Sequence, residues 1–494
     1  MFLSLEGWPY KQPRVAISTS QGILHPQEMA APASTALPWG GLPRNVSGKS
    51  AIRHILQHAS DVNNWDAFSE MKKSWVGADL PTPEHSPRYA IVDATISLMQ
   101  GAQSFSHEKS AGKWQDSQDV FARVAKTVQR CAELPDIEAI VVCVDKPSKV
   151  PVQKASTQAK RDTHFDAINR RRAKDTLEGM NVVRGHNADS HAAMVEDALR
   201  SYVTGRSSAR QAFERFLPIS APYDDQRREA TNVWLPGPVW GILASDRAAK
   251  PLLVQHFFGC TGLWQRTLDT VRNKTQGNAT APEATGVHVY VDFDNLDEGT
   301  EAYNDVGEAD GSWAVWMPVL KTRHGEGTTL VVTIDTDVAL IALLWQRLNS
   351  DTDMPLHICF SRPKSDTDLW MHTRECCSMV DAMWLGGVPS FTWACVYAGG
   401  SDFTEESAHS GVSIRRMVYA AQFVECKNAE DGLKLRQNIW EQKDGGPRPK
   451  RARGRDADDP ALVLAAGHTK WTLGYWHGMI DQNSTSAVEE PSTV

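Results

Sequence analysis

The stretch VVTIDTDVAL, residues 331–340, contains an apolar strand, two acids one residue apart and a second apolar run. Further apolar runs recur along the chain, separated by stretches with helical patterns. The six predicted strands lie at residues 89–94, 137–145, 287–294, 328–335, 355–361 and 391–400. Nearly continuous apolar strands that alternate with helices are typical of a mainly parallel sheet covered on both faces. The sequence therefore predicts an α/β fold.

Length and composition limit the class of protein. A chain of 494 residues is too long for one hydrophobic core, which predicts several domains or one α/β domain with large insertions. No run approaches the roughly 18 apolar residues of a membrane span, so we expect no membrane partner. The eight cysteines show no C-x-x-C spacing, which argues against a zinc site or a disulfide framework and favours a reducing compartment.

Basic residues are clustered, although the net charge of −8 gives no overall sign of nucleic-acid binding. RPKRARGR, residues 448–455, lies in a basic linker that we assign, with the C-terminal tail, to residues 446–494. A nuclear-import signal or a nonspecific nucleic-acid tail fits this run, and so does plain solvated charge. We expect a nuclear location and leave a cytoplasmic or mitochondrial one open. Residues 1–40 lack periodicity and are interpreted as a flexible N-terminal extension.

Acidic residues follow most of the predicted strands, and a further pair precedes a helical pattern. The seven acids are Asp93, Asp145, Glu308, Asp310, Asp335, Asp337 and Asp402. In open α/β sheets, ligands bind beyond the carboxyl ends of the strands, so we expect these acids to converge on one edge. Carboxylates a few ångströms apart raise one another's pKa unless cations neutralise them. Hard divalent cations such as Mg²⁺ bind through carboxylate oxygens and water, so seven acids can serve two ions.

Five blocks carry these acids in a specific order. They are YAIVDATISLMQ, IVVCVDKP followed by the basic stretch QAKRDTHFDAINRRR, GEADGS, TIDTD and GGSDFTE. In order and approximate spacing they resemble the flap endonuclease and XPG-type structure-specific 5′ nucleases, a family with a PIN-like α/β domain. The resemblance extends from about residue 41 to about residue 425. It implies a PIN-like mainly parallel sheet flanked by helices, with a helix–two-turn–helix element and a long, mainly helical insertion.

The resemblance also implies domain boundaries and a reaction. The nuclease domain would comprise residues 41–172, with a basic arch helix, and residues 287–400. The helical insertion would occupy residues 173–286 and the helix–two-turn–helix element residues 401–445. The implied reaction is two-metal hydrolysis of phosphodiester bonds in flap, nicked or 5′-ended DNA during replication or repair, with two Mg²⁺ ions that Mn²⁺ can replace. Glu308, Asp310 and Asp335 would hold the first ion, Asp337 and Asp402 the second, and Asp93 and Asp145 would order the water shell.

Basic residues after the second block would contact phosphates of the nucleic acid. The candidates there are Lys154, Lys160, Arg161, Arg170, Arg171 and Arg172, and those in the helix–two-turn–helix element are Gly411, Arg415 and Arg416. The chain departs from the family pattern at three places. Lys146 replaces a glycine after the second acid, Asp310 replaces a glutamate, and only Gly411 of a Gly-x-Gly turn is present.

Alternative interpretations remain for several features. A single Asp at a strand end is more often a turn or cap residue than a ligand, and RRRAK alone is typical of a solvated helix face. Asp292 or Asp294 could join the site, but a structural strand end is favoured. A nonenzymatic member of this fold that acts as a nucleic-acid scaffold or regulates RNA is the second functional hypothesis. RNA stays open as the substrate, and no clear sliding-clamp peptide is present.

Overall fold

The computed structural model divides the chain into two units, Met1–Gly41 and Leu42–Val494, and every described residue belongs to the second. The described residues are 50–62, 67–72, 86–104, 113–146, 152–183, 190–217, 233–260, 262–277, 286–292, 308–350, 355–361, 367–398, 401, 414, 418, 421, 422, 424–426, 431, 469, 470 and 472–480. Among the helices in these ranges, none combines the length and the apolar character of a membrane-spanning segment.

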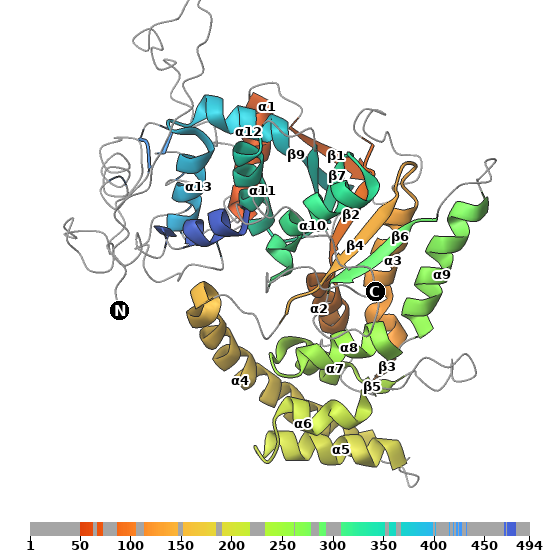
Figure 1. The fold of residues 1–494 in the computed structure, drawn as a ribbon. Helices are drawn as coiled ribbons and strands as arrows, with labels where there is room; N and C mark the ends of the chain where they lie inside the picture. The colour runs from red at the N-terminus through yellow and green to blue at the C-terminus, as the bar shows by residue number, and fades with distance from the viewer. Residues whose placement is uncertain are drawn as a thin grey trace, which may run out of the picture. The chain divides into compact units, whose positions relative to one another are not determined.

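A mainly parallel sheet forms the centre of the described part of the chain (Figure 1). Its seven described strands have the order β1-β9-β8-β7-β2-β4-β6. They are β1 Phe68–Lys72, β2 Tyr89–Asp93, β4 Ala139–Cys143, β6 His288–Asp292, β7 Thr329–Thr333, β8 Leu356–Phe360 and β9 Thr367–His372. Strands β6, β4, β2, β7 and β8 pair in parallel, whereas β9 and β1 pair antiparallel at one edge. The prediction of an α/β fold with a mainly parallel sheet is confirmed.

The predicted strand at 391–400 is wrong. Residues Gly387–Tyr397 form helix α13, which begins after Gly386 in the left-handed conformation. Its side chains are buried almost all round, from Val388 to Tyr397, so the sequence shows no helical period. A uniformly apolar run of this kind cannot be assigned to strand or helix by periodicity alone. The two antiparallel strands β1 and β9 were not predicted.

Helices cover both faces of the sheet (Figure 1). They are α1 Ser50–Val62, α2 Ala94–Ser104, α3 Ser117–Ala132, α10 Ala309–His324, α11 Asp337–Leu348 and α12 Thr373–Met383. Ala90 and Val92 of β2 belong to the hydrophobic cluster that includes α2 and α3. Tyr290 of β6 is in register with Val141 of β4, which is in register with Ile91 of β2. The ring centroid of Tyr290 lies 5.6 Å from that of Trp316 in α10. Side chains two residues apart on a strand lie on the same face of the sheet. The side chain of Asp93 therefore lies on the face that α10 covers, opposite the face covered by α2 and α3.

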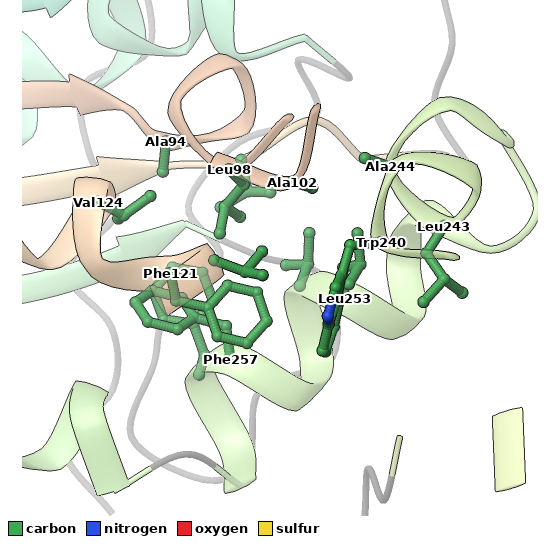
Figure 2. Close-up of a cluster of buried hydrophobic side chains, with 14 of the residues drawn as sticks. Ala94, Leu98, Ala102, Phe121, Val124, Trp240, Leu243, Ala244, Leu253 and Phe257 are labelled. Carbon is green, nitrogen blue, oxygen red and sulfur yellow. The ribbon is translucent and has the colours of Figure 1, made fainter. Parts of the chain in front are cut away.

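A second group of helices packs against α2 and α3. It comprises α4 Val152–Val183, α5 Ser190–Val203, α6 Ala209–Phe213, a short 3₁₀ turn Glu214–Phe216, α7 Gly237–Ser245, α8 Lys250–Cys260 and α9 Gly262–Gly277. Figure 2 shows Leu98 of α2 and Phe121 of α3 facing Trp240 of α7 and Phe257 of α8. The Phe121 and Phe257 ring centroids are 4.8 Å apart. Strands β3 Trp114–Asp116 and β5 Trp234–Pro236 pair antiparallel beside this cluster.

Helix α3 illustrates how local sequence sets this packing. The Asp116 carboxylate accepts a hydrogen bond from the backbone N–H of Gln118 at 2.9 Å and caps the first turn. Val120, Val124 and Val128 follow at intervals of four residues and are buried. This spacing places one apolar stripe against the sheet and against α9. The helix therefore joins the sheet to the second group of helices.

Candidate functional site

Three predicted acids lie at the carboxyl edge of three neighbouring strands. Strand β2 ends at Asp93, and its neighbours β4 and β7 end two residues before Asp145 and Asp335, respectively. Asp93 is only 5% exposed. It accepts a hydrogen bond from the Thr333 hydroxyl at 3.2 Å. Burial raises the pKa of Asp93 to about 7, and the charges of Asp145 and Asp335 add to the effect.

The TIDTD segment forms the turn between β7 and α11. The backbone N–H of Asp335 donates to the Thr333 hydroxyl at 3.0 Å, and that of Asp337 donates to the Asp335 carboxylate at 3.0 Å. Asp337 is the first residue of α11 and is fully buried. The Ser401 hydroxyl donates to its carboxylate at 3.0 Å. The position next to the predicted acid Asp402 therefore reaches this turn, although Asp402 itself lies outside the described residues.

Glu308 and Asp310 lie at the start of α10 on either side of one ammonium group. Lys154 Nζ is 2.9 Å from Glu308 Oε2 and 3.1 Å from Asp310 Oδ2. Burial raises the pKa of Glu308 and raises that of Asp310 well above its usual value, and Lys154 offsets the effect only in part. Burial acts to lower the pKa of Lys154, but the charges of Asp310 and Glu308 raise it well above its usual value. The lysine predicted to contact phosphate is thus placed between two predicted metal ligands.

Asp145 has a different counter-charge, which the sequence analysis missed. Lys250, the first residue of α8, places its Nζ 3.0 Å from Asp145 Oδ2. The backbone N–H of Ala309 donates to the other carboxylate oxygen at 3.1 Å. Burial acts to raise the pKa of Asp145, but Lys250 and Lys154 outweigh it and hold the pKa below its usual value. Asp145 and Lys250 are 105 residues apart, so no local pattern could have indicated the pair.

Lys146 and Asp292 form a separate buried ion pair. Their charged atoms are 2.7 Å apart, and neither side chain is exposed. The Trp316 indole donates to the second oxygen of Asp292 at 2.9 Å. Both features agree with the favoured interpretation of Asp292 as a structural strand end, and the ion pair compensates the buried charge of Lys146. Asp294 lies outside the described residues.

The other predicted phosphate contacts lie further along α4. Lys160, Arg161 and Arg171 are exposed. Arg170 pairs with Asp166 at 2.9 Å and also donates to the backbone carbonyl of Tyr202. Arg172 Nη1 lies 3.4 Å from Asn169 Oδ1. Positive charge is therefore exposed along α4. Three further predicted contacts lie outside the described residues: Gly411, Arg415 and Arg416.

A helix in the expected tail lies close to the acids of α10. Residues 472–480 are helical, and Trp476 and Ile480 within them are buried. Burial raises the pKa of Tyr475 to about 12, and the charge of Glu308 contributes to the rise. Residues 446–494 were assigned to a basic linker and C-terminal tail, within which Trp476 was interpreted as a core residue, and its burial agrees with that interpretation.

Whether these acids could bind a divalent cation depends on the chemistry of their oxygen atoms and on the distances between the side chains. The described acids offer carboxylate oxygens, which Mg²⁺ and Mn²⁺ prefer, and they outnumber the nearby ammonium groups of Lys154 and Lys250. Burial is the main cause of the raised pKa of Asp93, and the charges of Asp145 and Asp335 add to the rise. Within the described ranges, however, no three His, Cys, Asp or Glu side chains are grouped closely enough to hold an ion. The donor type therefore fits, while Lys154 is placed where a cation would contact Glu308 and Asp310.

A scan against protein-family models finds no match to this chain, and a search of curated proteins finds no relative.

Proposed function

We propose that this chain is a metal-dependent 5′ nuclease with a PIN-like domain. It would hydrolyse phosphodiester bonds in flap, nicked or 5′-ended DNA during replication or repair. The observation that supports this proposal most directly is the gathering of acids from β2, β4, the β7–α11 turn and α10 at one edge of the sheet. Those acids belong to four of the five sequence blocks that carry the family resemblance.

The acids at this edge would have different roles in binding metal ions and water. Glu308, Asp310 and Asp335 would hold one Mg²⁺ or Mn²⁺ ion, with Asp337 and Asp402 holding a second. Such a pair of ions supplies a nucleophile from water near neutral pH and neutralises charge on the leaving oxygen. The remaining acids, Asp93 and Asp145, would accept hydrogen bonds from ordered water.

Residues outside the acid set would position the acids and the substrate. Lys250 and the backbone N–H of Ala309 orient Asp145, and the Thr333 hydroxyl orients Asp93. Lys160 and Arg161 on α4 would bind the phosphate backbone without reading sequence. A nuclear location would follow from the basic run 448–455, which lies outside the described residues.

A nonenzymatic nucleic-acid scaffold is the second candidate, because Lys154 already forms ion pairs with two of the acids. One experiment separates the two functions. Labelled flap, nicked, blunt and single-stranded DNA, together with RNA of matched length, is incubated with the full chain in Mg²⁺ or in a chelator. The nuclease proposal expects Mg²⁺-dependent cleavage of structured or 5′-ended DNA. Binding of RNA without cleavage of any substrate would favour the scaffold.

A further inference from the structure

Lys154 is enclosed by acids rather than facing solvent. It is only 4% exposed, and its ammonium group forms ion pairs with both Glu308 and Asp310. A buried charge is costly unless paired, so these two contacts keep the ammonium group in place. The ion pairs also stabilise the two acids, because two buried carboxylates at the start of one helix would otherwise repel each other.

A divalent cation and this ammonium group compete for the same oxygens. Mg²⁺ binds carboxylate oxygens at about 2.0–2.1 Å, so an ion on Glu308 and Asp310 would lie within a few ångströms of Lys154 Nζ. Like charges at that distance repel strongly in a site with little water. We propose that Lys154 is the built-in counter-ion of the Glu308–Asp310 pair and that a divalent cation binds this pair by displacing its ammonium group. The inference rests on the proposed function, because both use the same acids.

Displacement has a consequence for α4. Lys154 is the third residue of that helix, which also carries Lys160 and Arg161 on its exposed side. Without the cation, two ion pairs join the first turn of α4 to the start of α10. With the cation bound, the first turn is released and the ammonium group is available to a phosphate. Cation binding and nucleic-acid binding should therefore strengthen each other, since such coupling is reciprocal.

Amine labelling tests displacement directly. The full chain is treated with an amine-reactive reagent in chelator, in Mg²⁺, and in KCl of equal ionic strength, and modified lysines are identified by mass spectrometry. Lys154 is expected to react slowly in chelator and KCl and at least several-fold faster in Mg²⁺. Lys146, fully buried against Asp292, should stay slow throughout, and exposed Lys160 should stay fast.

Cation affinity provides a readout independent of labelling and of cleavage. Lys154→Met removes the charge with little change in length, so Mg²⁺ and Mn²⁺ should bind at least about tenfold more tightly in calorimetry. Lys160→Met, on the same helix but exposed, should bind them like wild type. Lys154→Arg keeps the charge and should bind them no more tightly than wild type. If the Met variant does not fold, the labelling of Lys154 in the wild-type chain decides the question.

The outcomes separate this inference from the proposed function. If the ions bind wild type while Lys154 labelling is unchanged and Lys154→Met binds them no more tightly than wild type, the displacement is wrong and the metal site stands. If neither ion binds wild type or any variant, the metal site and the displacement are both wrong.

Discussion

Lys250 Nζ lies 3.0 Å from Asp145 Oδ2, which joins α8 to the carboxyl edge of the sheet. Lys250→Met should leave Asp145 without its nearest counter-charge. We expect the free energy of unfolding at neutral pH to fall by about 1–2 kcal/mol, because a partly buried, charge-assisted hydrogen bond is lost. Urea denaturation measures this change, and Lys250→Arg should recover most of it. Equal stability of Lys250→Met and wild type would contradict the prediction.

The Asp335 and Asp337 pair tests the proposed chemistry. Asp335→Asn combined with Asp337→Asn should abolish cleavage yet leave substrate binding within about tenfold of wild type, because the basic contacts of α4 are untouched. Both activities are measured on one flap substrate in Mg²⁺. Undiminished turnover by the folded double variant would rule out two-metal hydrolysis at this edge.

Because the carboxyl group of Asp93 is buried, we expect the stability of the metal-free protein to depend on pH. Its pKa is raised from 3.8 to about 7, so the folded state holds a proton that the unfolded chain releases near pH 4. The contribution to stability is therefore full at low pH and is lost as pH rises through about 7. The loss is on the order of a few kcal/mol, since each tenfold change in proton affinity is worth about 1.4 kcal/mol.

Asp93→Asn should remove much of this dependence. In chelator, the variant should show a smaller decline of stability between pH 5 and pH 8 than wild type, and a higher melting temperature at pH 8. Asp136→Asn, at an exposed acid, should leave the wild-type slope unchanged. Parallel curves for wild type and Asp93→Asn would show that Asp93 does not titrate in this range.

The exposed charges of α4 should contribute to nucleic-acid affinity. Lys160→Glu with Arg161→Glu is expected to weaken binding of all sequences alike and to reduce the salt slope by about one per lost phosphate contact. Titration of one flap substrate from low to moderate salt measures both quantities. Lys126→Glu, at an exposed position of α3, should change neither. A double variant with wild-type affinity and slope would remove this part of α4 from the interface.

Gly101 allows the close approach of α2 and α3. A Cβ atom at this position would overlap the backbone carbonyl of Val120, which cannot move without moving α3. Gly101→Ala should therefore lower the free energy of unfolding by about 1–3 kcal/mol through overpacking. Gly179→Ala in α4 meets no atom within 4 Å and should raise it by up to about 1 kcal/mol. Chemical denaturation of both variants tests the contrast.

The sequence by itself determined the features that depend on neighbouring residues. Five of the six predicted strands, including the one at 328–335, form the parallel part of the sheet. The carboxyl ends of parallel strands lie at the same edge of the sheet, which is why Asp93 and Asp335 were expected together at that edge. The failure at 391–400 has a local cause too, since a run buried on every side carries no period from which to tell α13 from a strand.

Only the tertiary structure decided which lysine forms an ion pair with which acid. Lys154 is separated by 154 residues from Glu308, and Lys250 by 105 residues from Asp145. Local periodicity indicates which face of a helix is apolar, but it does not indicate which distant element that face contacts. The contacts arise because β4, α4 and α8 each return to the same edge of the sheet, where burial makes an unpaired carboxylate or ammonium group costly. Pairing at that edge therefore follows from topology and desolvation, and neither of these is a property of a short stretch of sequence.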